Sequence, residues 1–316
     1  MTRRHSSKPT VSVVASVCNL ADGIADVVES LAASLRELRV PFEMVFVDDA
    51  STDGTWERLV SLSRRDRRLR LVRMRASFGE AAALDAGFRT ARGGTVLYVS
   101  GRVRVNAGGL PALLRRLDRD ADFVVGRRFP RRDSLLNRAV SRAFNVLARR
   151  ITAIPLRDIN SGVFATRREV LERIPFYGDL INFLPVLVMQ QGYRVVEEDV
   201  EQLPGSFRLS KYPKEYVQRF LDIVTVFFLT RYSKKPIHFM GFVGAVFAAV
   251  GLAIEGYLFV YRILGIGGIA GRPLLVLGAL LLVIGIQMVS IGLIGEMIIF
   301  THAGDIKEYN IEETIN

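Results

Sequence analysis

The chain has 316 residues, 50% of them hydrophobic, and its 43 lysines and arginines exceed its 32 aspartates and glutamates to give a net charge of +11. A mean hydropathy of +0.25 is high for a chain that lies wholly in water, and it excludes a disordered polyelectrolyte. The single cysteine, Cys18, excludes an internal disulfide and a zinc site held by several cysteines.

The first half alternates short β-branched runs with amphipathic segments. Residues 11–17 have the pattern of a buried strand, 24–38 that of a helix and 43–47 that of a second strand, which together predict a βαβ unit. The alternation continues with a helix from residue 55, a strand at 69–74, a helix at 79–92 and strands at 96–99 and 123–125. We therefore expect an α/β fold with a mostly parallel sheet and flanking helices.

The last eighty residues contain two apolar stretches, 237–261 and 273–300, each long enough to cross about 30 Å of hydrocarbon as a helix. A short Gly-rich link joins them, so we expect a hairpin with both chain ends on one side of the bilayer. The preceding Arg231, Lys234 and Lys235 predict that this side is cytoplasmic. Residues 237–316 carry a net charge of −3, so residues 1–236 carry +14. The polar first ten residues predict no signal peptide.

Two further segments, 135–151 and 214–232, interleave apolar residues with arginines or lysines at helical spacing and predict helices in the membrane surface. For the first, a core helix with a solvated basic face is the alternative. The predicted domains are a cytoplasmic unit at 1–213, an interfacial helix at 214–236, the hairpin at 237–300 and a cytoplasmic tail at 301–316. The glycines of the spans serve packing within the hairpin or contacts between subunits, and both interpretations stay open.

In parallel sheets ligands bind at the carboxyl ends of the strands, so the loops after the predicted strands are the places to look for chemistry. The loop at 47–55 puts Asp48 and Asp49 at a strand end and Asp53 before a helix. Asp49 is a candidate acceptor for a base or ribose, and Asp53 a candidate helix cap. A capping loop without a ligand is the alternative.

Five motifs then occur in a fixed order before the hairpin: VDDASTDGT at 47–55, SFGEAAALDAG at 77–87, GRRF at 126–129, DINSGVFA at 158–165 and SKY at 210–212. The set resembles the polyprenyl-phosphate glycosyltransferases of family 2, such as dolichyl-phosphate mannose synthase and its bacterial undecaprenyl-phosphate relatives. The resemblance covers nearly the whole chain. It implies a GT-A, Rossmann-like fold, an inverting transfer from a nucleotide-diphosphate sugar to a polyprenyl phosphate in the inner membrane, and a homo-tetramer or other homo-oligomer.

The resemblance also implies roles for individual residues. Asp48 and Asp49 correspond to positions that hold the nucleotide, and Gly79 lets the donor approach the backbone. The residues implied to bind the acceptor phosphate are Arg128, Arg138, Ser141, Ser210, Lys211 and Tyr212. Asp158, Ser161 and Gly162 match the active-site loop. We expect Asp158, Arg128 and Arg102 to carry the transfer.

The chemistry agrees with these roles, because a phosphate monoester has a second pKa of about 6 and is mostly a dianion near neutral pH. It needs no general base to act as a nucleophile. It needs to be aligned with the anomeric carbon of the sugar, and its charge has to be partly balanced by arginine side chains at the depth of the lipid headgroups. The same basic surface could meet nucleic acid, but the chain has no aromatic-basic reader motif, so we expect none.

The chain departs from the family where an Asp-x-Asp pair normally holds Mg²⁺ or Mn²⁺. It reads Ser100-Gly101-Arg102-Val103-Arg104, and a hard cation that takes oxygen ligands has no carboxylate there. We therefore predict no metal ligand. The usual Pro-x-Tyr-Asn-Glu is replaced at 15–20, and the usual Arg-x-x-Gly before the SKY motif is replaced at 205–208.

Two explanations of these departures stay open. In the first, Arg102 and Arg104 replace the metal as diphosphate ligands in the donor site. In the second, the chain has lost transfer activity and serves as a lipid-phosphate-binding or scaffolding subunit.

Overall fold

A computed structural model of the chain describes residues 9–101, 103–130, 156–174, 181, 183–203, 236–269 and 271–302. The chain divides into two compact units, Met1–Val226 and Phe227–Asn316. The predicted interfacial helices and the predicted boundary at 213 lie outside the described residues.

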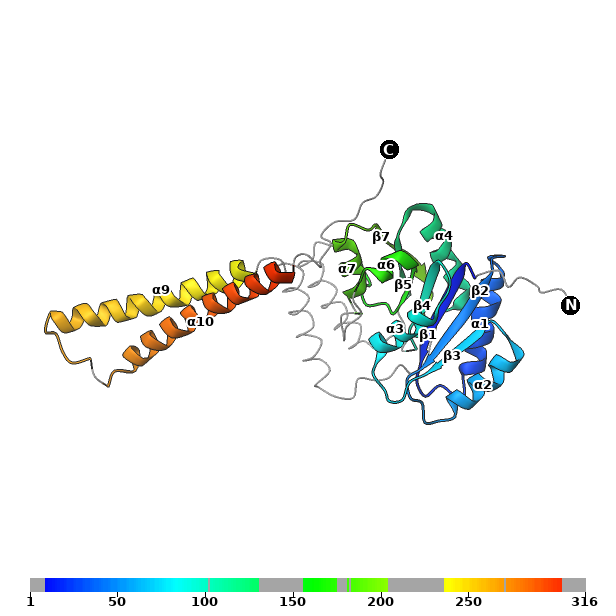
Figure 1. Ribbon diagram of the computed structural model, residues 1–316, viewed down its shortest axis with the longest axis horizontal. Helices are drawn as coiled ribbons and strands as arrows, with labels where there is room; N and C mark the ends of the chain where they lie inside the picture. Colours follow the sequence, from blue (N-terminus) through cyan, green and yellow to red (C-terminus); the bar gives the residue numbers. More distant parts are fainter. Residues whose placement is uncertain are drawn as a thin grey trace. The chain divides into compact units, whose positions relative to one another are not determined.

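The first unit is built on a seven-stranded sheet of order β3-β2-β1-β4-β6-β5-β7 (Figure 1). β6 runs antiparallel to its neighbours β4 and β5, whereas every other pairing is parallel. The mostly parallel sheet predicted from the sequence is therefore confirmed. The strands are β1 (Val11–Val17), β2 (Phe42–Asp48), β3 (Leu69–Arg73), β4 (Thr95–Val99), β5 (Phe123–Arg128), β6 (Val163–Arg167) and β7 (Val195–Val200).

Helices cover both faces of the sheet because the buried strands carry apolar residues on both sides. Within β1, Val13 packs in the core beneath α1 and α4, and Val14 packs in the core beneath α3. The helical elements are α1 (Ile24–Arg36), α2 (Thr55–Arg65), α3 (Glu80–Thr90), η1 (Ala107–Gly109), α4 (Leu110–Asp120), α6 (Arg168–Glu172) and α7 (Leu184–Gln190).

The strand order reverses between β1 and β4, because β2 and β3 lie on one side of β1 and the later strands on the other. At such a reversal the connections leave in opposite directions and open a crevice outside the carboxyl ends of the strands. The loops that follow β1 and β4 therefore line the place where this fold binds ligands.

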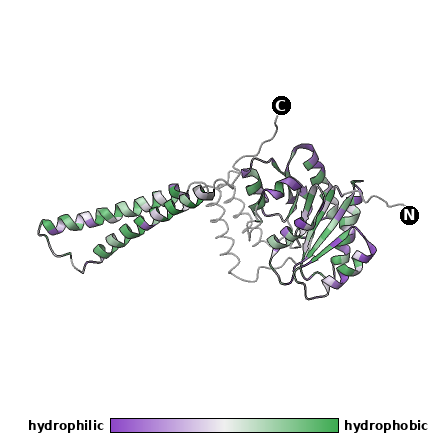
Figure 2. Ribbon diagram, in the orientation of Figure 1, coloured by the Kyte–Doolittle hydropathy of each residue, from purple (hydrophilic) through white to green (hydrophobic). Residues whose placement is uncertain are grey.

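The second unit is a hairpin of two long helices, α9 (Pro236–Ile263) and α10 (Pro273–His302). With 28 and 30 residues at 1.5 Å per residue, each exceeds the roughly 30 Å of a bilayer core. Figure 2 shows α9 and α10 coloured mostly as hydrophobic along their length, and large apolar side chains such as Phe242 and Val276 are about 70% exposed. Both helices are long and apolar enough to span a membrane.

Glycines bring the two helices into close contact. A Cβ on Gly251 would lie 2.7 Å from the carbonyl oxygen of Gly278, and one on Gly244 would lie 2.6 Å from that of Gly285. These distances are too short for any side chain, so these four glycines serve packing within the hairpin.

Candidate functional site

Asp48 ends β2 and is fully buried. Its Oδ1 accepts hydrogen bonds from the backbone N–H and the hydroxyl of Ser51, which closes the loop after the strand. Its Oδ2 faces the guanidinium of Arg73, whose Nε is 3.8 Å away. Asp48 thus fixes the shape of the loop to which the resemblance assigns the nucleotide.

Asp49 joins this loop to the segment before α3. Its carboxylate accepts from the Ser77 hydroxyl at 2.7 Å and from the backbone N–H groups of Phe78 at 2.9 Å and Gly79 at 3.3 Å. Gly79 has a φ of +87°, which a residue with a side chain rarely adopts. Phe78 beside it is 65% exposed. Asp49 therefore organises the Gly79 loop, and three of its acceptor positions are already used.

Asp53 links the loops after β1 and β2. It accepts from the backbone N–H of Ala21 at 2.8 Å and of Thr55 at 3.0 Å, and from the Thr55 hydroxyl. Although desolvation acts in the opposite direction, these hydrogen bonds lower the pKa of Asp53 below its ordinary value. The carboxylate therefore stays ionised at neutral pH and holds the first turn of α2 against the loop after β1.

The turn that follows β4 contains the residues that stand in place of the Asp-x-Asp pair implied by the resemblance. Ser100 is 1% exposed and its backbone N–H donates to the carbonyl of Gly162 at 2.8 Å. A Cβ on Gly101 would lie 2.2 Å from the carbonyl oxygen of Ser16, so only glycine fits there. The part of the chain that the structure describes holds no group of three or more His, Cys, Asp or Glu that could bind a metal ion. Arg104 is exposed, and Arg102 lies outside the described residues. The residues present do not fit a Mg²⁺ or Mn²⁺ site.

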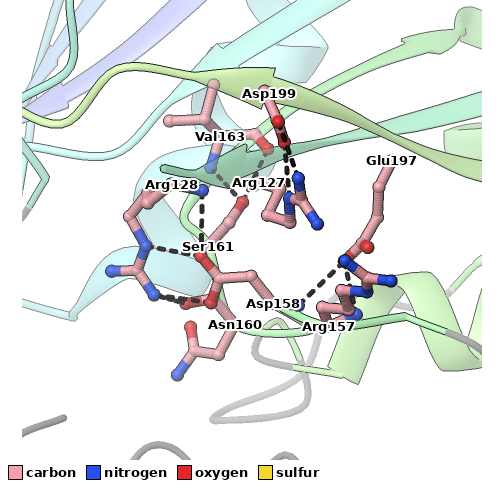
Figure 3. A network of polar contacts seen from close by, with 9 residues as sticks. All are labelled: Arg127, Arg128, Arg157, Asp158, Asn160, Ser161, Val163, Glu197 and Asp199. Atoms are coloured by element: carbon pink, nitrogen blue, oxygen red, sulfur yellow. Dashed lines mark hydrogen bonds and ion pairs between the residues drawn. The ribbon is translucent and has the colours of Figure 1, made fainter. Parts of the chain in front are cut away.

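An ion pair between Arg128 and Asp158 lies at the end of β5 (Figure 3). The guanidinium forks onto the carboxylate, with Nε to Oδ2 at 2.7 Å and Nη2 to Oδ1 at 2.8 Å, and Nη2 also donates to the carbonyl of Asn160 at 2.8 Å. Both side chains are at least 90% buried. A bidentate pair of this kind fixes both groups in orientation as well as in charge. The resemblance assigns Arg128 to the acceptor phosphate and Asp158 to catalysis, and the structure brings the two into direct contact.

Glu197 of β7 binds the backbone of the loop that carries Asp158, and it is not among the site residues predicted from the sequence. Its Oε1 accepts from the backbone N–H groups of Arg157 at 2.6 Å and Asp158 at 2.8 Å (Figure 3). Desolvation, with a smaller contribution from the charge of Asp158, raises the pKa of Glu197. Two residues on, Asp199 accepts from Arg127 Nη2 at 2.6 Å. The signal in the sequence is the run Glu197-Glu198-Asp199, but its pairing with β5 depends on a contact some seventy residues away.

The loop that carries Asp158 also touches the turn after β4. Ser161 is buried, and its hydroxyl donates to the carbonyl and accepts from the N–H of Val163. Gly162 has a φ of +72°, and a Cβ on it would lie 3.0 Å from the Cβ of Ser100. Two motifs separated by sixty residues therefore meet at one edge of the sheet. The remaining predicted acceptor residues, Arg138, Ser141, Ser210, Lys211 and Tyr212, lie outside the described residues.

Residues 12–175 match the family described as Glycosyl transferase family 2. The chain belongs to this family. Its similarity to the dodecaprenyl-phosphate galacturonate synthase of Rhizobium johnstonii is 32% identity over 305 residues, covering 93% of this chain and 89% of the relative. The undecaprenyl-phosphate 4-deoxy-4-formamido-L-arabinose transferase of Pectobacterium carotovorum subsp. carotovorum is 27% identical, with 97% and 94% covered. The resemblance to polyprenyl-phosphate glycosyltransferases of family 2 is therefore confirmed.

Solved structures of other sugar transferases share the fold of this family 2 chain. Glucosyl-3-phosphoglycerate synthase from Mycobacterium tuberculosis, in complex with Mn²⁺, UDP-glucose and phosphoglyceric acid, superimposes with a TM-score of 0.56 at 18% identity, covering 69% of this chain and 80% of that one. Mannosyl-3-phosphoglycerate synthase from Rubrobacter xylanophilus gives a TM-score of 0.55 at 19% identity, with 70% and 74% covered. The likeness extends to the fold and supports the GT-A-like architecture expected from the sequence.

Proposed function

We propose that this chain is a membrane-bound glycosyltransferase that moves a sugar from a nucleoside-diphosphate donor to a polyprenyl phosphate. The observation that carries the proposal is the full-length match to enzymes named for this reaction, which runs through the catalytic fold and the helical hairpin alike. A soluble transferase with a water-soluble acceptor would have no use for the two apolar helices.

The reaction is a single displacement with inversion at the anomeric carbon. An oxygen of the lipid phosphate dianion attacks that carbon, the new C–O bond forms, and the bond to the diphosphate breaks, with the electron pair leaving on the nucleoside diphosphate. The nucleophile is already ionised, so the protein has to align it and stabilise the charge that develops on the leaving group.

The proposed donor site uses the loops after β2 and β4 and the segment before α3. Its residues are Asp48, Asp49, Gly79, Arg102 and Arg104. The proposed acceptor site adds the ion pair of Arg128 with Asp158 to residues outside the described ones, namely Arg138, Ser141, Ser210, Lys211 and Tyr212. Asp158 and Arg128 act as one unit, because the carboxylate holds the guanidinium in a single orientation.

The proposed topology puts the catalytic unit and both chain ends on the cytoplasmic side. The charge distribution supports it, since Arg231, Lys234 and Lys235 precede the first span. Assembly as a homo-oligomer is part of the proposal and rests on the resemblance alone.

The test is a transfer assay on the full chain in liposomes that contain undecaprenyl phosphate. The protein is supplied with mixed UDP- and GDP-sugars, and lipid products are read by mass spectrometry. A sugar phosphoryl polyprenol is the expected product. Retention of undecaprenyl phosphate without product from any donor would contradict the proposal and favour the inactive, lipid-binding alternative.

A further inference from the structure

The turn that replaces the metal-binding motif, residues 100–104 (the 100–104 turn), is held by a directed chain of hydrogen bonds. The Tyr98 hydroxyl donates to Glu80 Oε1 at 3.0 Å, and Ser16 Oγ lies 3.1 Å from the same hydroxyl oxygen. Because the single hydrogen of Tyr98 goes to Glu80, Ser16 is the donor to Tyr98. The Ser16 oxygen in turn accepts from the backbone N–H of Gly101 at 3.1 Å.

Protein contacts fix the remainder of the 100–104 turn as well. The N–H of Ser100 donates to Gly162, and the N–H of Val103 donates back to the carbonyl of Ser100 at 3.1 Å, which closes a β-turn. At the far end, the carbonyl of Arg104 accepts from the N–H of Leu203 at 2.9 Å. The described residues of this turn, 100, 101, 103 and 104, are therefore ordered by four protein hydrogen bonds and need no cation for that order, while Arg102 lies outside the described residues.

The charge of the 100–104 turn is opposite to that of a cation site. It contains two arginines and no carboxylate, so a divalent ion placed there would meet like charge and find only a buried serine hydroxyl and backbone oxygens. A diphosphate is negatively charged, and a guanidinium group can bind two of its oxygens at once through parallel N–H donors. The turn lies at the reversal of strand order, where such a ligand binds in this class of sheet.

We propose that the 100–104 turn binds the diphosphate of the donor through Arg102 and Arg104 and that no divalent cation takes part. This inference rests on the proposed function for the identity of the donor, and it names the ligand contact of that same site. During transfer the two guanidinium groups stabilise the charge that collects on the departing diphosphate. The hydrogen-bonded chain from Glu80 to Gly101 holds the turn in place before the donor arrives.

The experiment measures binding of UDP and GDP to the full chain by calorimetry, once with EDTA and once with Mn²⁺. We expect one of the two nucleotides to bind with the same Kd under both conditions. The double variant Arg102→Ala, Arg104→Ala is expected to weaken that binding about 10- to 100-fold, because charge-assisted hydrogen bonds are lost. The matched control is Arg64→Ala, Arg65→Ala, which removes the same charge from the exposed end of α2 and is expected to leave Kd unchanged.

A second variant tests the order of the turn without changing its charge. Ser16→Ala removes the acceptor for Gly101 and the donor to Tyr98, and is expected to weaken nucleotide binding about 10-fold. Unchanged binding in this variant would overturn the role of the hydrogen-bonded chain.

The outcomes separate this inference from the proposed function. Tighter nucleotide binding with Mn²⁺, wild-type binding by the double arginine variant, or no nucleotide binding in either condition would each overturn the inference. Metal-independent binding without transfer to undecaprenyl phosphate would support the inference and contradict the proposed function. Transfer to undecaprenyl phosphate that occurs only with Mn²⁺ would support the proposed function and contradict the inference.

Discussion

Glu197 offers the sharpest test of the network that holds Asp158. In Glu197→Ala the backbone N–H groups of Arg157 and Asp158 lose their acceptor. The exposed Arg157 amide can form a hydrogen bond with water instead. The part-buried Asp158 amide loses its acceptor, which costs about 1–2 kcal/mol of folding free energy. In a domain of this size that amounts to a fall of about 2–8 °C in Tm. Glu197→Gln keeps an oxygen at the same place and is expected to retain the free energy of unfolding within about 0.5 kcal/mol.

The assay combines thermal unfolding with transfer kinetics and uses Glu198→Ala as its control. Glu198 is the next residue of β7 and points to the other side of the strand, so this variant is expected to change neither quantity. In Glu197→Ala the misplaced Asp158 lowers kcat about 10- to 100-fold, and Glu197→Gln restores it. Equal kcat and Tm in wild type and Glu197→Ala would refute the reasoning.

The raised pKa of Glu197 adds a pH dependence with a definite sign. Above its folded pKa the carboxylate is ionised in both states, and its ionisation is less favourable in the folded protein than in the unfolded chain. As the pH falls through the raised pKa toward the ordinary carboxyl range, the folded state takes up the proton first. Wild type therefore gains stability relative to Glu197→Gln over that interval. A difference in Tm that does not change with pH would contradict this assignment.

Three more perturbations test other parts of the molecule. Asp158→Leu removes the ion-pair partner of the mostly buried Arg128 and is expected to cost about 3 kcal/mol of folding free energy. Adding Arg128→Leu in the same chain is expected to restore most of that stability but not the transfer activity. If chemical denaturation shows that the two losses of stability are additive, this expectation is contradicted. Asp49→Ala removes the acceptor of three hydrogen bonds and is expected to weaken nucleotide binding about 10-fold in calorimetry; an unchanged Kd would contradict the organising role of this carboxylate. Gly251→Leu forces α9 and α10 apart and is expected to destabilise the hairpin by about 1–3 kcal/mol in detergent, whereas Gly256→Leu, with open space at its Cα, does not; equal effects would exclude close packing at Gly251.

The sequence predicts the core of the sheet well because the signals there are local. β1, β2 and the start of α2 lie where β-branched runs and the loop at 47–55 place them. α4 is not among the predicted elements, although the apolar spacing of Leu110, Leu113, Leu114 and Leu117 is a sufficient local signal for it. β6 is different, because its five residues are inserted antiparallel between two parallel strands, and this pairing depends on chain segments far apart.

The candidate site divides in the same way. The motif loops identify Asp48, Asp49 and Asp158 by residue type and by their order along the chain. What the sequence does not predict is which groups pair with them. Ser77 and Glu197 reach Asp49 and the Asp158 amide across 28 and 39 residues, and only the fold brings them together.

The pairing of Arg128 with Asp158 changes where the charge for the acceptor must come from. The network at the end of β5 contains Arg127, Arg128 and Arg157 together with Asp158, Glu197 and Asp199, so its formal charges cancel when every group is ionised. A cluster without net positive charge does not attract a phosphate dianion, and the pKa of Glu197 within it is raised mainly by desolvation. Residues 131–155 contain six arginines and one aspartate. The attraction for the lipid phosphate is therefore expected from that segment, while Arg128 fixes the position of Asp158.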